Sequence, residues 1–221
     1  MVFARNKINF TQLIAYRICS RTTSKRCMDI SLVIIFAPVL LPLLLAITCV
    51  LLLRDGQIFY SQIRVGQGGL PFRLWKFRTM EPDADLLLDV YLSNRPELAR
   101  EWSDTMKLRN DPRIARFGHL LRRSSLDELP QIWNVLLGEM SLVGPRPVLH
   151  DELVNKYRGL SSPYLACLPG LTGMWQVMGR NQLDYSQRIK LDTDYSVKQC
   201  LSLDLIILWR TLGVVLRGTG Y

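Results

Sequence analysis

The stretch ISLVIIFAPVLLPLLLAITCVLLL, residues 30–53, decides the fold class, because its 24 residues carry no charged side chain. A helix rises about 1.5 Å per residue, so this stretch is long enough to cross a hydrocarbon core of about 30 Å. Pro38 and Pro42 lie near its middle, and each removes a backbone donor and clashes with the preceding turn. We therefore expect a membrane helix that breaks at Pro38.

The charges around this segment leave its topology open. Residues 1–29 carry six Lys or Arg against one acid, and the whole chain carries 28 against 19, a net charge of +9. Basic flanks are typical of the cytoplasmic side, which favours a hairpin that enters and leaves the membrane there. A full span has to export a large basic domain, but long domains cross largely regardless of charge. Composition alone therefore allows both topologies.

The chain beyond this segment predicts a mixed α/β domain. The whole chain is 48% hydrophobic and 21% charged, which excludes a disordered protein. Residues 56–80 are typical of a β-hairpin, because branched and aromatic residues flank a glycine-rich turn. Residues 83–107 show an acidic amphipathic helical pattern broken near Pro96, and residues 130–140 predict a helix that begins at Pro130.

The C-terminal stretch predicts an amphipathic helix that is too polar to span a membrane. Asp204 and Thr211 keep to one side of the helical pattern, away from an apolar stripe. With Trp209 beside that stripe, the helix fits the membrane interface as well as it fits a protein core. The stripe consists of Leu201, Leu205, Leu208, Leu212 and Val215.

Two adjacent carboxylates, Asp127 and Glu128, form the candidate catalytic centre within LRRSSLDELPQ, residues 121–131. A purely structural role is open to them, because Ser125 and Glu128 have the spacing of a helix capping box. Acids near a helix start also interact favourably with the helix dipole. Taken alone, the segment does not decide between structure and chemistry.

Arginines in the same part of the chain favour phosphate chemistry. Arg122 precedes the two acids, and Arg146 follows them in a Gly-Pro-Arg-Pro loop. Guanidinium groups bind phosphate, and a carboxylate beside them can hold Mg²⁺ or attack phosphorus. The excess positive charge of the chain likewise favours a phosphate-rich partner, whether nucleic acid, anionic lipid or nucleotide.

Several segments in order carry a resemblance to a known family. They are KRCMD (25–29), the proline-broken apolar segment, KFRTM (76–80), LDELPQ (126–131), MSLVGPRP (140–147), PGLTG (169–173) and GRN (179–181). Together they resemble the bacterial sugar transferase family, the small monotopic phosphoglycosyl transferases, over about residues 24–221. The helix-breaking pair of that family is usually Ser-Pro, whereas this chain has Ala37-Pro38.

The resemblance implies an α+β membrane protein. Its parts are a re-entrant N-terminal membrane helix hairpin, interfacial amphipathic helices and a small cytoplasmic α/β catalytic domain. The resemblance therefore favours the hairpin over a full span. In this chain we expect a basic N-terminal segment, the re-entrant membrane helix, the catalytic domain and a C-terminal interfacial helix. Their expected boundaries are residues 1–24, 25–54, 55–200 and 201–221.

The resemblance also implies a reaction. The family transfers a sugar 1-phosphate from a UDP-sugar to undecaprenyl phosphate and releases UMP, on the cytoplasmic face of the bacterial inner membrane. Asp127 corresponds to the nucleophile that forms a phosphosugar aspartate, and Glu128 to the acid that assists it. Both carboxylates are the expected ligands of Mg²⁺, with Mn²⁺ as a substitute. Arg122 and Arg146 correspond to phosphate-binding residues.

Other positions follow from the same resemblance. Gln176, Arg180 and Asn181 are expected in the nucleotide pocket. Lys25, Arg26 and Asp29 correspond to an interfacial charge motif, although such residues also fit ordinary basic flanking of a membrane segment.

Two other functions remain open at this point. One is transfer of an N-acetylamino sugar phosphate, although residues 172–177 and the Gly220-Tyr221 ending resemble transferases of galactose or glucose phosphate that start exopolysaccharides. The other is a non-catalytic membrane-tethered module that binds anions through the arginine-rich residues 108–123. We expect no nucleic acid partner. The resemblance allows a homo-oligomer and downstream glycosyltransferases as further partners.

Overall fold

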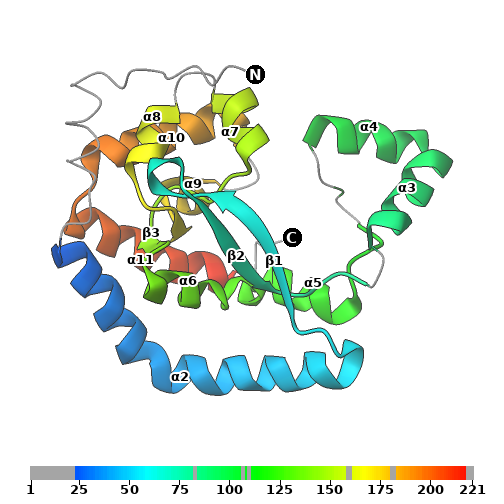
Figure 1. Ribbon diagram of the computed structural model, residues 1–221, viewed down its shortest axis with the longest axis horizontal. Coiled ribbons are helices and arrows are strands. Elements are labelled where there is room, and N and C mark those ends of the chain that lie inside the picture. The colour runs from blue at the N-terminus through cyan, green and yellow to red at the C-terminus, as the bar shows by residue number, and fades with distance from the viewer. Residues whose placement is uncertain are drawn as a thin grey trace.

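The computed structural model shows a mixed helical protein with small sheets and one long N-terminal helix (Figure 1). It describes residues 23–81, 84–105, 108, 111–157, 161–179 and 183–217. Within these ranges, one helix is long and apolar enough to cross a membrane. The architecture is therefore compatible with a membrane-anchored α+β protein.

Helix α2, Thr23–Asp55, contains the apolar stretch together with Pro38 and Pro42. Its ribbon bends part-way along (Figure 1), as expected for a helix with internal prolines. Only 11% of its most apolar window is buried inside the protein. Its apolar side chains therefore face away from the rest of the fold.

Both ends of α2 nevertheless pack against the same folded body. Near the start of the helix, the Asp29 carboxylate accepts a hydrogen bond of 3.2 Å from the backbone N–H of Leu142. Near its end, Ile47 and Leu51 lie in a buried cluster with Phe77. The helix is thus attached at two places, with its apolar middle between them.

The predicted β-hairpin is confirmed. Strands β1, Phe59–Val65, and β2, Pro71–Phe77, pair antiparallel through all seven residues of each strand. The short 3₁₀ turn η1, Gln67–Gly69, joins them, and Gly68 has φ 69°, a conformation that favours glycine. The hairpin runs through the middle of the molecule (Figure 1).

The predicted helical stretches after the hairpin are also confirmed. One helix ends before Arg95 and the next begins at Pro96, which is the expected break. Pro130 immediately precedes the helix that it was expected to start. The elements are α3 (Ala84–Asn94), α4 (Pro96–Thr105), α5 (Arg116–Arg123), the 3₁₀ turn η2 (Leu126–Glu128) and α6 (Gln131–Leu137).

The second half of the chain builds the main core around a short parallel sheet. Strands β3, Ser141–Val143, and β4, Gly170–Thr172, form that sheet. Around it, fully or nearly fully buried side chains from β2, α6, α10 and α11 pack into one cluster. The helices are α7 (His150–Tyr157), α8 (Ser161–Ala166), α9 (Met174–Met178), α10 (Tyr185–Lys198) and α11 (Leu201–Leu216).

Helix α11 turns its polar side to the protein and most of its apolar stripe outward. Asp204 and Ile207 are 0% and 2% exposed, and the hydroxyls of Thr211 and Thr172 are hydrogen-bonded at 2.8 Å. This is the reverse of a helix on a soluble core, and it is typical of a helix at a membrane interface. The exposed apolar residues include Leu201, Leu205, Trp209, Leu212 and Val215.

A buried polar network attaches the start of α2 to α11. The Lys25 ammonium donates to the Asp204 carboxylate at 2.6 Å, to the Tyr195 hydroxyl at 3.1 Å and to the Val143 carbonyl at 3.0 Å. The Tyr195 hydroxyl also donates to Asp204, at 2.7 Å. The lysine and the aspartate are therefore mutually neutralised and hydrogen-bonded inside the protein.

Candidate active site

The candidate catalytic carboxylate lies in a tight turn between two helices. Asp127 is in η2 and is 8% exposed. Ser125 directly precedes this turn and has φ 59°. This left-handed conformation is uncommon for a residue other than glycine. Ser125 makes no side-chain cap bond to η2, so the structure does not support the capping-box alternative. The left-handed residue directs the chain into the turn instead.

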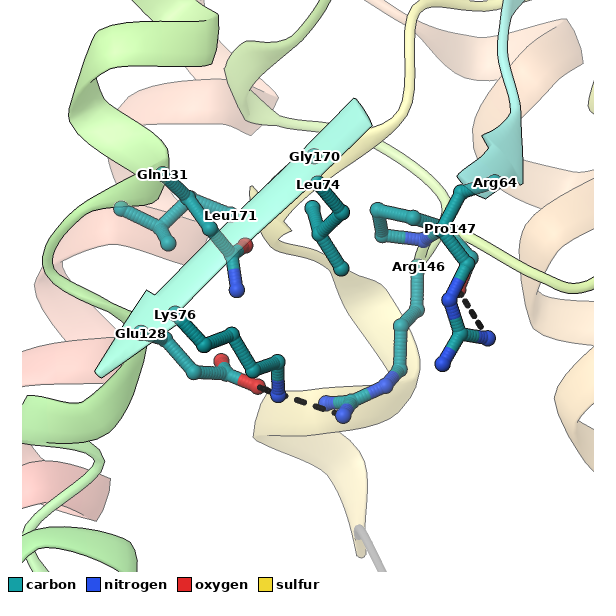
Figure 2. Close-up of a pocket in the computed structure, with 9 residues that line it drawn as sticks. All are labelled: Arg64, Leu74, Lys76, Glu128, Gln131, Arg146, Pro147, Gly170 and Leu171. Carbon is teal, nitrogen blue, oxygen red and sulfur yellow. Dashed lines mark hydrogen bonds and ion pairs between the residues drawn. The ribbon is translucent and has the colours of Figure 1, made fainter. Parts of the chain in front are cut away.

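Two cations hold Glu128 beside Asp127. The Lys76 ammonium lies 2.7 Å from the Glu128 carboxylate and 3.8 Å from that of Asp127. The Arg146 guanidinium contacts the same Glu128 oxygen at 3.2 Å. Figure 2 shows Lys76, Glu128 and Arg146 converging on one side of the pocket. The sequence-predicted residues Glu128 and Arg146 are thus brought together.

Burial and charge act in opposite directions on Asp127. Burial raises the pKa of its carboxyl group above the ordinary value, and Lys76 opposes this effect. The neighbouring carboxylate of Glu128 raises the pKa further, whereas Arg122 and Arg146 lower it. A partly desolvated carboxylate with nearby cations is an arrangement suited to attack on an electrophile.

Arg122 reaches the site from the last turn of α5. Its Nε donates to the Thr79 hydroxyl at 2.9 Å. Burial lowers the pKa of its guanidinium, and Asp127 acts in the opposite direction. A Cβ added at Gly118 would lie 2.2 Å from the Thr79 carbonyl, so this glycine lets α5 approach the segment that follows β2.

Arg146 is positioned by a loop that packs closely against β4. A Cβ added at Gly144 would lie 2.3 Å from the Leu168 carbonyl, and one at Gly170 would lie 2.0 Å from the Gly144 amide nitrogen. Both positions therefore require glycine. The prolines on either side of Arg146 restrict the loop further.

A pocket opens beside these residues, and its charged lining is mainly basic. Three cations, Arg64, Lys76 and Arg146, face one acid, Glu128 (Figure 2). Such an excess of positive charge favours a multiply charged anion such as a diphosphate. The other lining residues are Leu74, Gln131, Pro147, Gly170 and Leu171.

Helix α9 brings further polar groups to this region. Gln176 is 6% exposed, and neither its amide nitrogen nor its amide oxygen has a hydrogen-bond partner among the described residues. The ring of Trp175 contacts two guanidinium groups, that of Arg146 at 6.0 Å and that of Arg188 at 4.9 Å. Buried polar atoms without partners are uncommon in folded proteins, so Gln176 fits a ligand-binding role. Arg180 and Asn181 lie outside the described residues.

The remaining predicted positions lie away from the carboxylates. Lys25 and Asp29 are 7% and 1% exposed, so their side chains face the protein and not a lipid headgroup. Arg26 donates hydrogen bonds to the last carbonyls of α6, those of Val135 and Leu136, where a cation also suits the helix dipole. Pro38 lies inside α2.

Sequence reasoning missed three basic residues of this region. Lys76 lies in the KFRTM segment that carried the family resemblance, and strand alternation places it on the same face as Leu74. Arg64 and Arg188 carried no signal in the sequence, because their role depends on where β1 and α10 pack. Part of the arginine-rich stretch 108–123 faces the protein interior, because Arg113 forms a buried ion pair with Asp111 at 2.6 Å.

The carboxylate pair fits a metal that binds together with a substrate. Among the described residues, no group of three or more His, Cys, Asp or Glu side chains gathers. Mg²⁺ is commonly bound by one or two carboxylates, waters and substrate phosphates. Asp127 and Glu128 meet that requirement, whereas a metal site made of protein ligands alone would need more of them.

Comparison with known proteins identifies similar sugar transferases and exopolysaccharide production proteins. The chain is 42% identical to the exopolysaccharide production protein ExoY of Sinorhizobium fredii, over 89% of this chain and 87% of that protein. It is 43% identical to an undecaprenyl-phosphate galactose phosphotransferase of Salmonella typhimurium, over 92% of this chain and 42% of that protein. It is 37% identical to a UDP-glucose:undecaprenyl-phosphate glucose-1-phosphate transferase of Xanthomonas campestris pv. campestris, over 90% of this chain and 40% of that protein.

The chain therefore spans about two fifths of the length of the last two relatives and most of the length of ExoY. The family model for bacterial sugar transferases matches residues 20–218, which is nearly the whole chain. The chain belongs to the bacterial sugar transferase family.

Proposed function

We propose that this protein transfers a sugar 1-phosphate from a UDP-sugar to undecaprenyl phosphate and releases UMP. The observation that carries the proposal is a buried carboxylate, Asp127, beside a pocket with three cations and one acid. Relatives named for the transfer of galactose or glucose phosphate to undecaprenyl phosphate support the same reaction. The product would start an exopolysaccharide or another surface glycan, which the name of ExoY as an exopolysaccharide production protein supports.

The reaction proceeds in two displacements at one phosphorus atom. A carboxylate oxygen of Asp127 attacks the β-phosphorus of the UDP-sugar, the bond from that phosphorus to the bridging oxygen breaks, and UMP leaves. A phosphate oxygen of undecaprenyl phosphate then attacks the same phosphorus and releases the Asp127 carboxylate. The sugar diphosphate lipid that results keeps the sugar and its phosphate together.

The cations of the site offset repulsion between the reacting groups. The nucleophile, the UDP-sugar diphosphate and the lipid phosphate are all anions, so they repel one another before any bond forms. Lys76 and Arg146 lie at the carboxylate pair, and Arg122 approaches it from α5. Positive groups fixed in these positions stabilise charge on the transferring phosphoryl group.

We expect activity to depend on a divalent cation. Mg²⁺ held by Asp127, Glu128 and the diphosphate would neutralise phosphate charge. Chelator should therefore abolish UMP release, and Mg²⁺ or Mn²⁺ should restore it. Because Glu128 is already paired with Lys76 and Arg146, Mg²⁺ alone should leave the melting temperature unchanged, whereas Mg²⁺ with UDP should raise it. Full activity in excess EDTA contradicts this assignment.

The apolar exterior supports association with a membrane. Exposed apolar side chains cover α2, and more are exposed on α6 and α11, among them Trp133, Leu137 and Trp209. Contiguous apolar surface of this kind is unfavourable in water and typical of membrane-bound proteins. We place this surface in the bacterial inner membrane, with the catalytic domain on the cytoplasmic face where UDP-sugars occur.

The two attachments of α2 support a re-entrant segment. A straight spanning helix separates its ends by the thickness of the hydrocarbon core, about 30 Å. Here both ends of α2 contact the domain that carries the active site, through Asp29 at one end and Leu51 at the other. A bend at Pro38 and Pro42 lets both ends remain on one side of the membrane.

Replacement of Pro38 and Pro42 by Leu should straighten α2, because it restores two backbone donors and removes two steric clashes. The N-terminus should then move to the opposite side of the membrane. A single cysteine near Met1, in a variant lacking the five native cysteines, reports this by labelling intact cells with an impermeant reagent. A cysteine at Leu70, in the exposed hairpin turn, is the control for the catalytic domain. Labelling near Met1 in the wild-type background contradicts the hairpin.

Turnover of defined substrates tests the proposed function. Purified protein is incubated with polyprenyl phosphate, Mg²⁺ and UDP-galactose, UDP-glucose or UDP-N-acetylglucosamine in turn, and UMP release is measured. We expect release with galactose or glucose. Release with the N-acetylamino sugar alone favours the other transferase class, and salt-sensitive anion binding without UMP release favours the non-catalytic module.

A further inference from the structure

Arg64 enters the pocket from the end of the hairpin opposite to the carboxylates. On the β-ladder Arg64 is opposite Phe72 and Lys76 is opposite Tyr60, so all four lie on one face of the hairpin. The two cations are four ladder positions apart, which is about 13 Å along the strands. Figure 2 shows Arg64 on one side of the pocket and Lys76 with Glu128 on the other.

Arg64 and Arg146 extend into the same pocket from β1 and from the loop after β3 (Figure 2). Burial, followed by repulsion from Arg146, lowers the pKa of Arg64. Nε of Arg64 is buried and has no hydrogen-bond partner among the described residues. Two like charges in one pocket, one of them with an unused donor, favour an anion bound between them.

A second group of residues holds Arg64 in this position. The Glu152 carboxylate lies 3.8 Å from Arg64 and 3.1 Å from Arg188, and the Tyr185 hydroxyl donates to it. Arg188 in turn lies over the ring of Trp175, 4.9 Å from its centroid, and Arg146 contacts the same ring at 6.0 Å. Contacts with Glu152 and Trp175 therefore restrict the two arginine side chains, as a preorganised binding site requires.

We propose that Arg64 and Arg146 form a second phosphate subsite, which binds the nucleotide-side phosphate of the diphosphate while the transferred phosphate lies at Asp127. This inference rests on the proposed function for the name of its ligand. It assigns a substrate-binding role to Arg64 and divides the pocket into a transfer end and a nucleotide end.

The same chemistry could serve the lipid phosphate, but the position of Arg64 favours the nucleotide. Arg64 is the penultimate residue of β1, and this strand leads away from the end of α2 toward α8 (Figure 1). Lys76, which contacts the carboxylates, pairs with Tyr60 near the start of β1, so the carboxylates lie nearer than Arg64 along the hairpin to the exposed apolar surface of α2. A lipid phosphate, which stays near that surface, is therefore expected at the Asp127 end.

Binding and kinetic measurements on Arg64→Gln, Arg64→Lys and Arg73→Gln test the subsite. Arg73 is the matched control, because it lies on the opposite, exposed face of the same hairpin. The dissociation constants of UDP and of inorganic pyrophosphate are measured with Mg²⁺ present, together with KM for the UDP-sugar and for polyprenyl phosphate. Melting temperatures of all variants confirm that they are folded.

We expect Arg64→Gln to weaken binding of UDP and pyrophosphate by about tenfold or more, which is the usual cost of a charged hydrogen bond. KM for the UDP-sugar should rise with it, KM for polyprenyl phosphate should not change, and Arg73→Gln should match wild type. Arg64→Lys should be intermediate, because it keeps the charge and loses the planar fork.

Wild-type UDP affinity in Arg64→Gln overturns the inference, and so does a rise confined to KM for polyprenyl phosphate, which would assign Arg64 to the lipid. The proposed function fails separately, by absence of UMP release from the wild-type enzyme. If pyrophosphate binding still depends on Arg64 in that case, the phosphate subsite stands without the transferase assignment. Failure of wild type to bind either anion overturns the subsite.

Discussion

Asp127→Asn should reduce UMP release by about a thousandfold or more, as is usual when a covalent nucleophile is removed. The amide has nearly the shape of the carboxylate, but it cannot displace UMP from the UDP-sugar. Release is measured with UDP-galactose or UDP-glucose, polyprenyl phosphate and Mg²⁺. The exposed Asp151 on α7 is the matched control, because Asp151→Asn makes the same chemical change outside the site.

The same substitution should leave the fold intact and raise the melting temperature at pH 7. Burial holds the pKa of Asp127 above its value in the unfolded chain. A carboxyl group with a raised pKa favours folding at low pH, and that contribution is lost as pH rises through the folded pKa. Asn removes the cost of burying the ionised group. A wild-type rate of UMP release by Asp127→Asn contradicts the nucleophile assignment, and unfolding of the variant contradicts this account of its stability.

Lys25→Met should destabilise the protein strongly by leaving Asp204 charged and unpaired inside it. Asp204 is 0% exposed, and its partners are Lys25 and Tyr195. Removal of one member of a buried ion pair typically costs about 3–5 kcal/mol, against a total stability of about 5–15 kcal/mol for a typical protein. We expect a large drop in melting temperature in detergent and increased proteolysis at the start of α2.

A double variant separates the loss of the pair from the loss of lysine itself. Lys25→Met with Asp204→Leu removes both charges, so it should recover much of the lost stability. Glu81→Gln is the control, because Glu81 pairs with Arg54 at 3.3 Å on the surface, where its side chain is 42% exposed. Such exposed pairs contribute about 0–1 kcal/mol. Equal melting temperatures for Lys25→Met and Glu81→Gln contradict the structural role of the buried pair.

Local patterns predicted the elements whose signals are complete within a short stretch. The hairpin of residues 56–80, the break at Pro96 and the helix after Pro130 are all confirmed. Each depends on turn glycines, prolines or apolar periodicity, which act over a few residues. The capping-box alternative at Ser125 is not supported, because the same spacing also fits a left-handed residue that leads into a 3₁₀ turn.

Helix periodicity found the amphipathic C-terminal helix but not which side meets the protein. Asp204 and Thr211 marked the side that usually faces water, yet they face the core through Lys25 and Thr172. An amphipathic pattern states that two faces differ. Which face points toward the protein depends on the residues that bond to it. Here those residues, Lys25 and Thr172, are more than 35 residues away from Asp204 and Thr211 in the chain.

Patterns within short stretches predict the long apolar helix, the hairpin and the paired acids Asp127 and Glu128, and several such stretches in order predict the family. Which basic side chains meet at those acids depends on the folded chain. Lys76 comes from β2, Arg64 from β1, and Arg146 from the loop after β3. The contribution of a charge to a site depends on its distance through space. The packing of the hairpin against α6, β3 and β4 sets those distances, so the pocket exists only in the folded chain.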